Sequence, residues 1–266
     1  MSKKTAAQQF KYPGRRMAMD GNTAVIMCER ESSDAAGAYP ITPSTQMGEY
    51  WAEEAAKGHV NISGRPLIFI EPEGEHAAAA VTAGMSMSGL RASNFSSAQG
   101  IAYMHESLYA AVGKRLPYVL NMGCRAITKS SLNVHCGHDD YHCIDDTGFA
   151  QVMGKNAQEA ADLNLIGRKL AELSLTPAVV AQDGFLTTHL IEPLQVPERE
   201  LIAEFLGRPD DIGCLVQQRA GIRRTHAGAG LGGSAGRGHA RPGLLDVWQS
   251  TEVRMRGKPV VDDPLD

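Results

Sequence analysis

Three residues of this sequence have side chains that could do chemistry near the start of a helix or the end of a strand. Glu75 opens a run of small residues that predicts a helix, and an acid in a first helical turn usually just complements the helix dipole. The guanidinium of Arg125 could bind a carboxylate through two parallel hydrogen bonds, which lysine cannot reproduce. Thr42 lies between two prolines, an arrangement typical of a structural turn. Residue type alone therefore leaves a structural role open for Glu75 and Thr42.

Two further stretches contain residues that often bind ligands. Residues 135–143 are rich in histidine, cysteine and aspartate, but their spacing matches no standard zinc motif. We expect them to line a polar pocket and assign no metal ligand, with a zinc site as the less favoured alternative. Residues 228–233 match the glycine pattern of dinucleotide-binding loops, yet no strand precedes them and no apolar helix follows. That context argues against nucleotide binding.

The elements that must position these residues alternate along the chain. We expect helices over residues 23–32, 43–57, 75–85, 99–114 and 158–173, and strands over residues 38–41, 66–71, 92–96, 118–122 and, as the last one, 176–182. Alternating strands and helices predict an α/β fold with a mainly parallel sheet and helices on both faces. Ligands of such sheets bind beyond the carboxyl ends of the strands, where Thr42, Glu75 and Arg125 are expected.

Composition divides the chain into three parts. Residues 1–19 are expected to form an N-terminal extension, residues 20–207 the α/β domain, and residues 208–266 a tail. Residues 220–243 are dense in glycine, arginine and alanine without a helical or strand period, so we expect the tail to be flexible. A lineage-specific end and a shifted reading frame would both explain this composition.

Charge, cysteine content and hydropathy exclude several classes of function. The chain has 266 residues, 43% of them hydrophobic, which is enough for one sizeable core. Its formal net charge of −4 offers no basic field that would attract nucleic acid or anionic lipid. The five cysteines include no CxxC pair, which indicates a reduced compartment and no iron–sulfur cluster held by this chain alone. We find no signal peptide and no apolar run of about 20 residues, and expect a cytoplasmic protein without membrane contact.

Several motifs in a fixed order resemble one known family. They are Asp20-Gly-Asn, Tyr39-Pro-Ile-Thr-Pro-Ser, Glu71-Pro-Glu-Gly-Glu-His, Phe95-Ser-Ser-Ala-Gln-Gly, Cys124-Arg-Ala-Ile, Thr147-Gly-Phe and Asp183-Gly-Phe-Leu-Thr-Thr-His. Together they resemble domain I of pyruvate:ferredoxin oxidoreductase and the alpha subunits of its 2-oxoacid relatives, over residues 18 to 207. The resemblance implies a thiamine-pyrimidine-binding-like fold.

The resemblance also implies roles for the three residues named first. Glu75 would be the catalytic and cofactor-binding glutamate that shares a proton with N1′ of the aminopyrimidine of thiamine diphosphate. Arg125 would bind the carboxylate of the 2-oxoacid, and the hydroxyl of Thr42 would face the substrate. Asp145 and Asp146 stand where the family often has a basic residue, so the identity of the 2-oxoacid stays open.

An enzyme of this family needs more than this chain. The resemblance implies that thiamine diphosphate is shared with a partner domain, and that magnesium and the iron–sulfur clusters lie on partner domains only. The expected reaction is oxidative decarboxylation of a 2-oxoacid to acyl-coenzyme A. Electrons would pass to ferredoxin or flavodoxin through the other subunits, and the isolated chain would be inactive. The alternative is a non-catalytic or truncated remnant that acts at most in assembly.

Overall fold

A six-stranded parallel sheet forms the centre of the protein. The computed structural model describes residues 10–129 and 131–207. The strands lie in the order β3-β2-β4-β5-β7-β6, and each neighbouring pair is parallel. Their bounds are β2 Ala35–Ala38, β3 Ile68–Ile70, β4 Ala92–Ser96, β5 Val119–Cys124, β6 Ala150–Gly154 and β7 Ala178–Asp183. All carboxyl ends therefore meet at one edge of the sheet.

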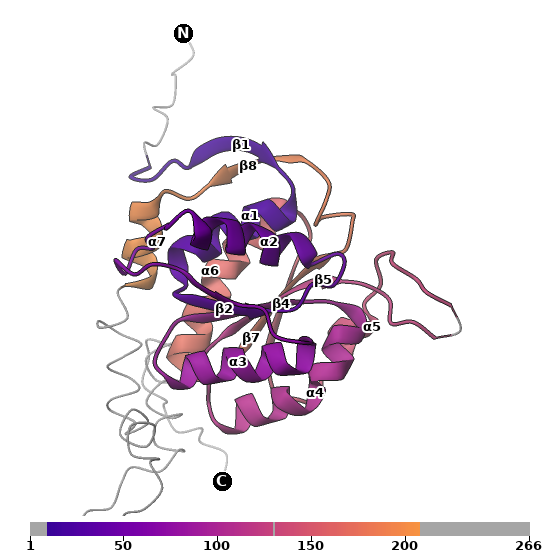
Figure 1. Ribbon diagram of the computed structural model, residues 1–266. Coiled ribbons are helices and arrows are strands. Elements are labelled where there is room, and N and C mark those ends of the chain that lie inside the picture. Colours follow the sequence, from indigo (N-terminus) through magenta and orange to yellow (C-terminus); the bar gives the residue numbers. More distant parts are fainter. Residues whose placement is uncertain (1–9, 130, 208–266) are drawn as a thin grey trace, which may run out of the picture.

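Helices cover both faces of this sheet, as Figure 1 shows. On one face α3 (Glu75–Met87) and α4 (Ala98–Gly113) bury a core that includes Met104 and Leu120. On the other face α1 (Gly21–Ser32), α2 (Thr45–Ala56) and α6 (Ala157–Ser174) bury a core that includes Trp51 of α2 and Phe95 of β4. The predicted fold class, a mainly parallel α/β sheet with helices on both faces, is confirmed.

Local sequence signals explain where the long helices begin and end. The side chain of Asp20 accepts the backbone N–H of Thr23 and caps α1, and Asn156 caps α6 in the same way through Glu159. Such caps satisfy backbone donors that the first helical turn leaves free. Helix α6 ends at Leu175, whose backbone is left-handed. These helices lie close to the predicted ranges because each boundary is encoded within a few residues.

A second, two-stranded sheet was not predicted. β1 (Arg15–Met19) pairs antiparallel with β8 (Glu192–Val196), and α7 (Arg199–Leu206) follows. β1 lies in the segment expected to be an N-terminal extension. The strand expected over residues 176–182 is present as β7. The expectation that it is the last strand was wrong, because β8 follows it. This pairing joins residues about as far apart as the described chain permits, so no local pattern signals it.

The expected strand over residues 38–41 was also wrong in its position. β2 ends at Ala38, and residues 39–44 form a loop that precedes α2. Pro40 and Pro43 lack the backbone N–H that a strand inside a sheet must donate. The peptide bond between Thr42 and Pro43 is cis. The loop carries Thr42 away from the sheet and over its carboxyl edge.

A buried ion pair connects the sheet with the helices above it. Glu29 of α1 and Arg168 of α6 are both fully buried, and their carboxylate and guanidinium lie 3.0 Å apart. Burial alone would raise the pKa of Glu29, but Arg168 and hydrogen bonds from Ser33, Ser93 and Asn121 lower the pKa below its usual value. This network makes the ionised carboxylate part of the folded structure.

Two expectations concern residues outside the described part of the chain. The tail over residues 208–266 and the glycine pattern at residues 228–233 both lie there. Among the helices that the structure describes, none is both long enough and apolar enough to cross a membrane.

Candidate functional site

Arg125 and Thr42 meet at the carboxyl edge of the sheet. Arg125 directly follows β5, and its Nη1 donates to the backbone oxygen of Thr42 at 2.8 Å. Its Nε donates to the backbone oxygen of Asn133 at 3.1 Å. The residue is 6% exposed, whereas Thr42 is exposed. Nη2 of Arg125 has no hydrogen-bond partner among the described residues, so this donor remains available to a ligand.

Glu75 lies at the same edge, as the first residue of α3. It is half-buried and packs against Gly100 of α4, where an added Cβ would lie 2.7 Å from Cγ of Glu75 and 2.6 Å from Oγ of Ser96. Glycine at position 100 therefore leaves the space that the Glu75 side chain occupies. Within the described residues, the carboxylate of Glu75 has no hydrogen bond or ion pair. No hydrogen bond joins it to Thr42 or Arg125.

Sequence reasoning missed Ser44, which ties together three strand ends. Its buried hydroxyl donates to the backbone oxygen of Ser96 at 2.7 Å and accepts the backbone N–H of Gly123 at 2.9 Å. Ser44 thereby holds the loop after β2 against the ends of β4 and β5. The pattern Thr-Pro-Ser marks a turn, but nothing in it indicates which distant groups the serine contacts.

Asp140, also missed, connects the two parts of the site. One carboxylate oxygen accepts the backbone N–H of Ala98 at 2.7 Å and that of Arg125 at 2.9 Å. Ala98 begins α4 with a positive φ of 45°, a conformation that a non-glycine residue adopts only when its surroundings hold it. Burial raises the pKa of Asp140 to about 6, although these backbone N–H groups act in the opposite direction. Asp140 thus positions Arg125 and the helix that carries Gly100.

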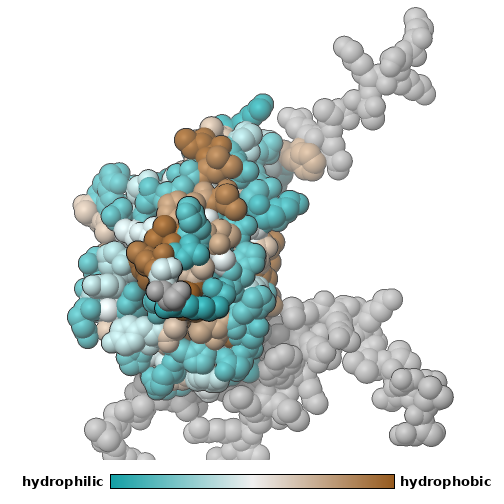
Figure 2. Space-filling model, turned by 90° about the vertical axis from the view of Figure 1, so that its right-hand side faces the viewer, coloured by the Kyte–Doolittle hydropathy of each residue, from teal (hydrophilic) through white to brown (hydrophobic). Residues whose placement is uncertain are grey.

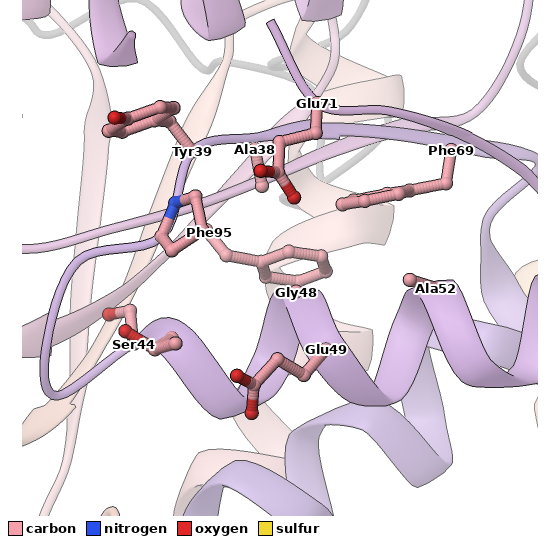
Figure 3. Close-up of a pocket in the computed structure, with 11 residues that line it drawn as sticks. Ala38, Tyr39, Ser44, Gly48, Glu49, Ala52, Phe69, Glu71 and Phe95 are labelled. Carbon is pink, nitrogen blue, oxygen red and sulfur yellow. The ribbon is translucent and has the colours of Figure 1, made fainter. Parts of the chain in front are cut away.

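A pocket of about 110 Å³ opens beside Ser44, on the α2 side of the sheet. Figure 3 shows the ring of Phe95 in this pocket, with Glu71 above it and Glu49 on α2 below. Tyr39 and Phe69 complete much of its wall. Both glutamates are exposed. This volume is well below the roughly 300–1,000 Å³ of an ordinary small-molecule site.

Apolar side chains gather on the surface of the same edge. Leu132, Leu186, Leu190 and Ile191 are each more than half exposed, in the loops that follow β5 and β7. Figure 2 looks onto this side of the molecule, where hydrophobic residues lie among polar ones. These side chains are therefore available for a contact with another protein or domain.

Residues 135–143 do not act as a single cluster. His142 contacts Asp145, whereas Cys136 and His138 both contact Asp183 at the end of β7. Burial and the hydrogen bond to Asp183 raise the pKa of the Cys136 thiol to about 11. The structure therefore separates the two halves of a segment that looks continuous in the sequence.

Comparison with known sequences identifies similar proteins. Residues 28–227 match the family model described as pyruvate flavodoxin/ferredoxin oxidoreductase, thiamine diphosphate-binding. Pyruvate synthase subunit PorA of Pyrococcus furiosus is 33% identical over 253 residues, which is 94% of this chain and 60% of that protein. PorA of Thermotoga maritima is 36% identical over 195 residues, 72% of this chain and 48% of that protein. Pyruvate-flavodoxin oxidoreductase of Klebsiella pneumoniae is 34% identical over 196 residues, 74% of this chain and 17% of that protein.

A solved structure also matches this fold. It is 2-oxoglutarate:ferredoxin oxidoreductase from Magnetococcus marinus with 2-oxoglutarate, coenzyme A and succinyl-CoA bound. The TM-score is 0.60 and the sequence identity 25%, over 71% of this chain and 32% of that one. The chain thus spans at most 60% of the length of these relatives.

Proposed function

The chain belongs to the pyruvate flavodoxin/ferredoxin oxidoreductase family, and on this premise we propose that it supplies the pyrimidine side of a shared thiamine diphosphate site. The complete enzyme would convert a 2-oxoacid and coenzyme A to acyl-coenzyme A and carbon dioxide. The observation that carries the proposal is the match to the thiamine diphosphate-binding model, which includes Thr42, Glu75 and Arg125. Bound thiamine diphosphate would supply the carbon nucleophile and accept the electrons that decarboxylation leaves behind.

Glu75 is suited to hold a proton at N1′ of the aminopyrimidine. Its carboxylate is half-buried and has no partner among the described residues, so it is free to form a hydrogen bond with a ring nitrogen. Gly100 and the start of α3 fix where the side chain can lie. A carboxyl group held within hydrogen-bond reach can give and take back a proton during turnover. The residues present therefore fit the pyrimidine half of this cofactor.

Arg125 and Thr42 are suited to hold the carboxylate of the 2-oxoacid. The two backbone acceptors of Arg125 fix the plane of its guanidinium, while Nη2 remains free. A fixed guanidinium binds a carboxylate with less loss of side-chain freedom than a mobile lysine. Thr42 is exposed on the loop after β2, and its backbone oxygen lies within 2.8 Å of Nη1 of Arg125.

Other domains or subunits would complete the site. The pocket of about 110 Å³ is too small to enclose a cofactor, and the apolar loops at this edge are exposed. We assign magnesium, the diphosphate contacts and the iron–sulfur clusters to those partners, and ferredoxin or flavodoxin to the electron output. The remnant alternative is less well supported, because Glu75, Thr42 and Arg125 are all present and lie at one edge of the sheet.

The test is reconstitution with subunits that complete the thiamine diphosphate site and carry the iron–sulfur clusters. We expect 2-oxoacid- and coenzyme A-dependent reduction of ferredoxin by the complex, and none by the chain alone with thiamine diphosphate and magnesium. Glu75→Gln should abolish turnover while the complex still assembles, because an amide cannot exchange this proton. Glu73→Gln is the matched control, since Glu73 is an exposed neighbour in the same segment. Turnover by the isolated chain, or full activity of Glu75→Gln, would refute the proposal.

A further inference from the structure

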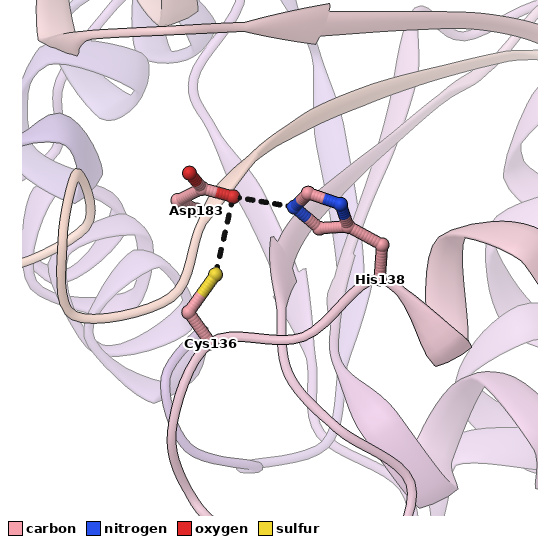
Figure 4. Close-up of side chains that lie close together, drawn as sticks. All are labelled: Cys136, His138 and Asp183. Carbon is pink, nitrogen blue, oxygen red and sulfur yellow. Dashed lines mark hydrogen bonds and ion pairs between the residues drawn. The ribbon is translucent and has the colours of Figure 1, made fainter.

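Cys136, His138 and Asp183 bring three metal-binding atoms together, as Figure 4 shows. Sγ of Cys136 donates to Oδ1 of Asp183 at 3.2 Å, and Nε2 of His138 lies 2.7 Å from the same oxygen. The three ligand atoms lie within 4.8 Å of one another. We propose that these three residues bind one Zn²⁺ ion through Sγ, Nε2 and Oδ1. The proposal uses none of the roles proposed for Glu75, Thr42 and Arg125.

The distances agree with a tetrahedral zinc ion after a small side-chain adjustment. Ligand atoms at about 2.0–2.3 Å from zinc lie roughly 3.3–3.8 Å from one another. The separations of 3.2 Å and 2.7 Å to Oδ1 of Asp183 lie just below that range, and the ligand atoms of Cys136 and His138 are within 4.8 Å of each other. The contact between Cys136 and Asp183 now contains the thiol proton, and the metal ion would replace it.

The donor set favours zinc over the common hard cations. Magnesium and calcium prefer oxygen ligands alone, whereas one thiolate, one imidazole and one carboxylate suit zinc. Three protein ligands leave a fourth position for water or another oxygen ligand. The side chains of His138 and Asp183 are 46% and 30% exposed, so solvent can reach that position.

The backbone holds the ligands in place without a metal. Gly137 lies between the two ligands of the loop and packs against Ala126, where an added Cβ would be 2.9 Å from its atoms. The N–H of Ala126 donates to the oxygen of His135, and that of His142 donates to the oxygen of His138. Asp183 ends β7, which has a neighbouring strand on each side in the sheet. Because the backbone around the ligands is already held in place, the protein loses little conformational freedom when an ion binds.

The proposed ligands differ from those that the sequence segment suggests by itself. His142 and Cys143 belong to the same histidine- and cysteine-rich stretch, but neither belongs to the group of three. His142 contacts Asp145 through Nδ1. These two residues therefore provide controls with the same chemistry in the same segment.

The experiment measures Zn²⁺ binding to the full 266-residue chain, prepared free of metal, by competition with a chromogenic chelator. We expect binding of a single ion, weakened about tenfold or more in Cys136→Ser and His138→Asn. His142→Asn and Cys143→Ser should bind as the unchanged chain does. Circular dichroism of each variant verifies that it is folded.

Cobalt gives a second readout that does not depend on a variant. Co²⁺ bound to the unchanged chain should show a thiolate-to-metal charge-transfer band and intense tetrahedral d–d bands, and Cys136→Ser should lose the former. Absence of the charge-transfer band, or of Zn²⁺ binding, would overturn the proposal. Loss of binding in His142→Asn or Cys143→Ser, with Cys136→Ser unaffected, would overturn it as well.

Discussion

Arg125 donates from Nη1 to the backbone oxygen of Thr42, at 2.8 Å, and not to its hydroxyl. This hydrogen bond joins the end of β5 to the loop after β2, across the intervening strand β4. Since the acceptor belongs to the backbone, the position of Arg125 does not depend on the side chain at residue 42. The two residues can therefore be tested separately.

Arg125→Lys should raise KM for the 2-oxoacid about 10- to 100-fold in the reconstituted complex, with a smaller change in kcat. The ammonium keeps the charge but cannot satisfy Asn133, Thr42 and a substrate carboxylate in the plane of a guanidinium. Steady-state kinetics with varied 2-oxoacid measure both constants. Arg16→Lys, on exposed β1, should leave them unchanged. An unaltered KM in Arg125→Lys would exclude substrate binding by this residue.

Thr42→Ala keeps the backbone oxygen that Arg125 uses. If the hydroxyl contacts substrate, KM should rise about 5- to 10-fold while the stability of the chain stays the same. Thr42→Ser, which keeps the hydroxyl, should restore most of the affinity. The same KM in the wild type, Thr42→Ala and Thr42→Ser would show that residue 42 contributes its backbone alone.

Gly100→Ala should lower turnover without unfolding the chain. The added Cβ would meet Cγ of Glu75 at 2.7 Å and Oγ of Ser96 at 2.6 Å, so the Glu75 side chain must move. Alanine favours a helix over glycine by about 1 kcal/mol, which offsets part of the steric cost. Gly113→Ala in the same helix is the control, because a Cβ there has nothing within 4 Å. Equal kcat in both variants would argue against a catalytic position for Glu75.

Glu29→Gln should lower the free energy of unfolding by about 3–5 kcal/mol at pH 7, because Arg168 would stay buried without its counter-charge. The pKa of Glu29 is lowered in the folded state, so its ionisation stabilises the fold above the unfolded-state pKa of about 4.3. That stabilisation is lost as the pH falls through the lower folded-state pKa. The difference between the two proteins should therefore shrink below pH ~4.

Urea unfolding at a series of pH values measures this difference. Glu53→Gln removes an exposed carboxylate that pairs with Lys57 and should change the free energy of unfolding by less than about 1 kcal/mol. A difference between wild type and Glu29→Gln that stays constant as the pH is lowered would contradict the assignment of a lowered pKa to Glu29.

The sequence by itself was sufficient for features that neighbouring residues encode. The cap that Asp20 provides for α1 and the apolar residues of β5 and β7 were readable, because a cap or a buried strand needs only a short stretch of chain. The alternation of strands and helices then implied a parallel sheet, whose geometry places Thr42, Glu75 and Arg125 at one edge. Their chemical roles came from the family resemblance and remain predictions.

Only the tertiary structure decided which distant groups touch. The pairing of β1 with β8 and the bridge that Asp140 makes between Ala98 and Arg125 have no local signature. Asp183 lies 45 residues beyond His138 in the chain, yet it joins His138 and Cys136 because β5 and β7 are adjacent in the sheet. Such contacts depend on strand order and on the paths of loops, which the packing of the whole domain determines and no segment encodes alone.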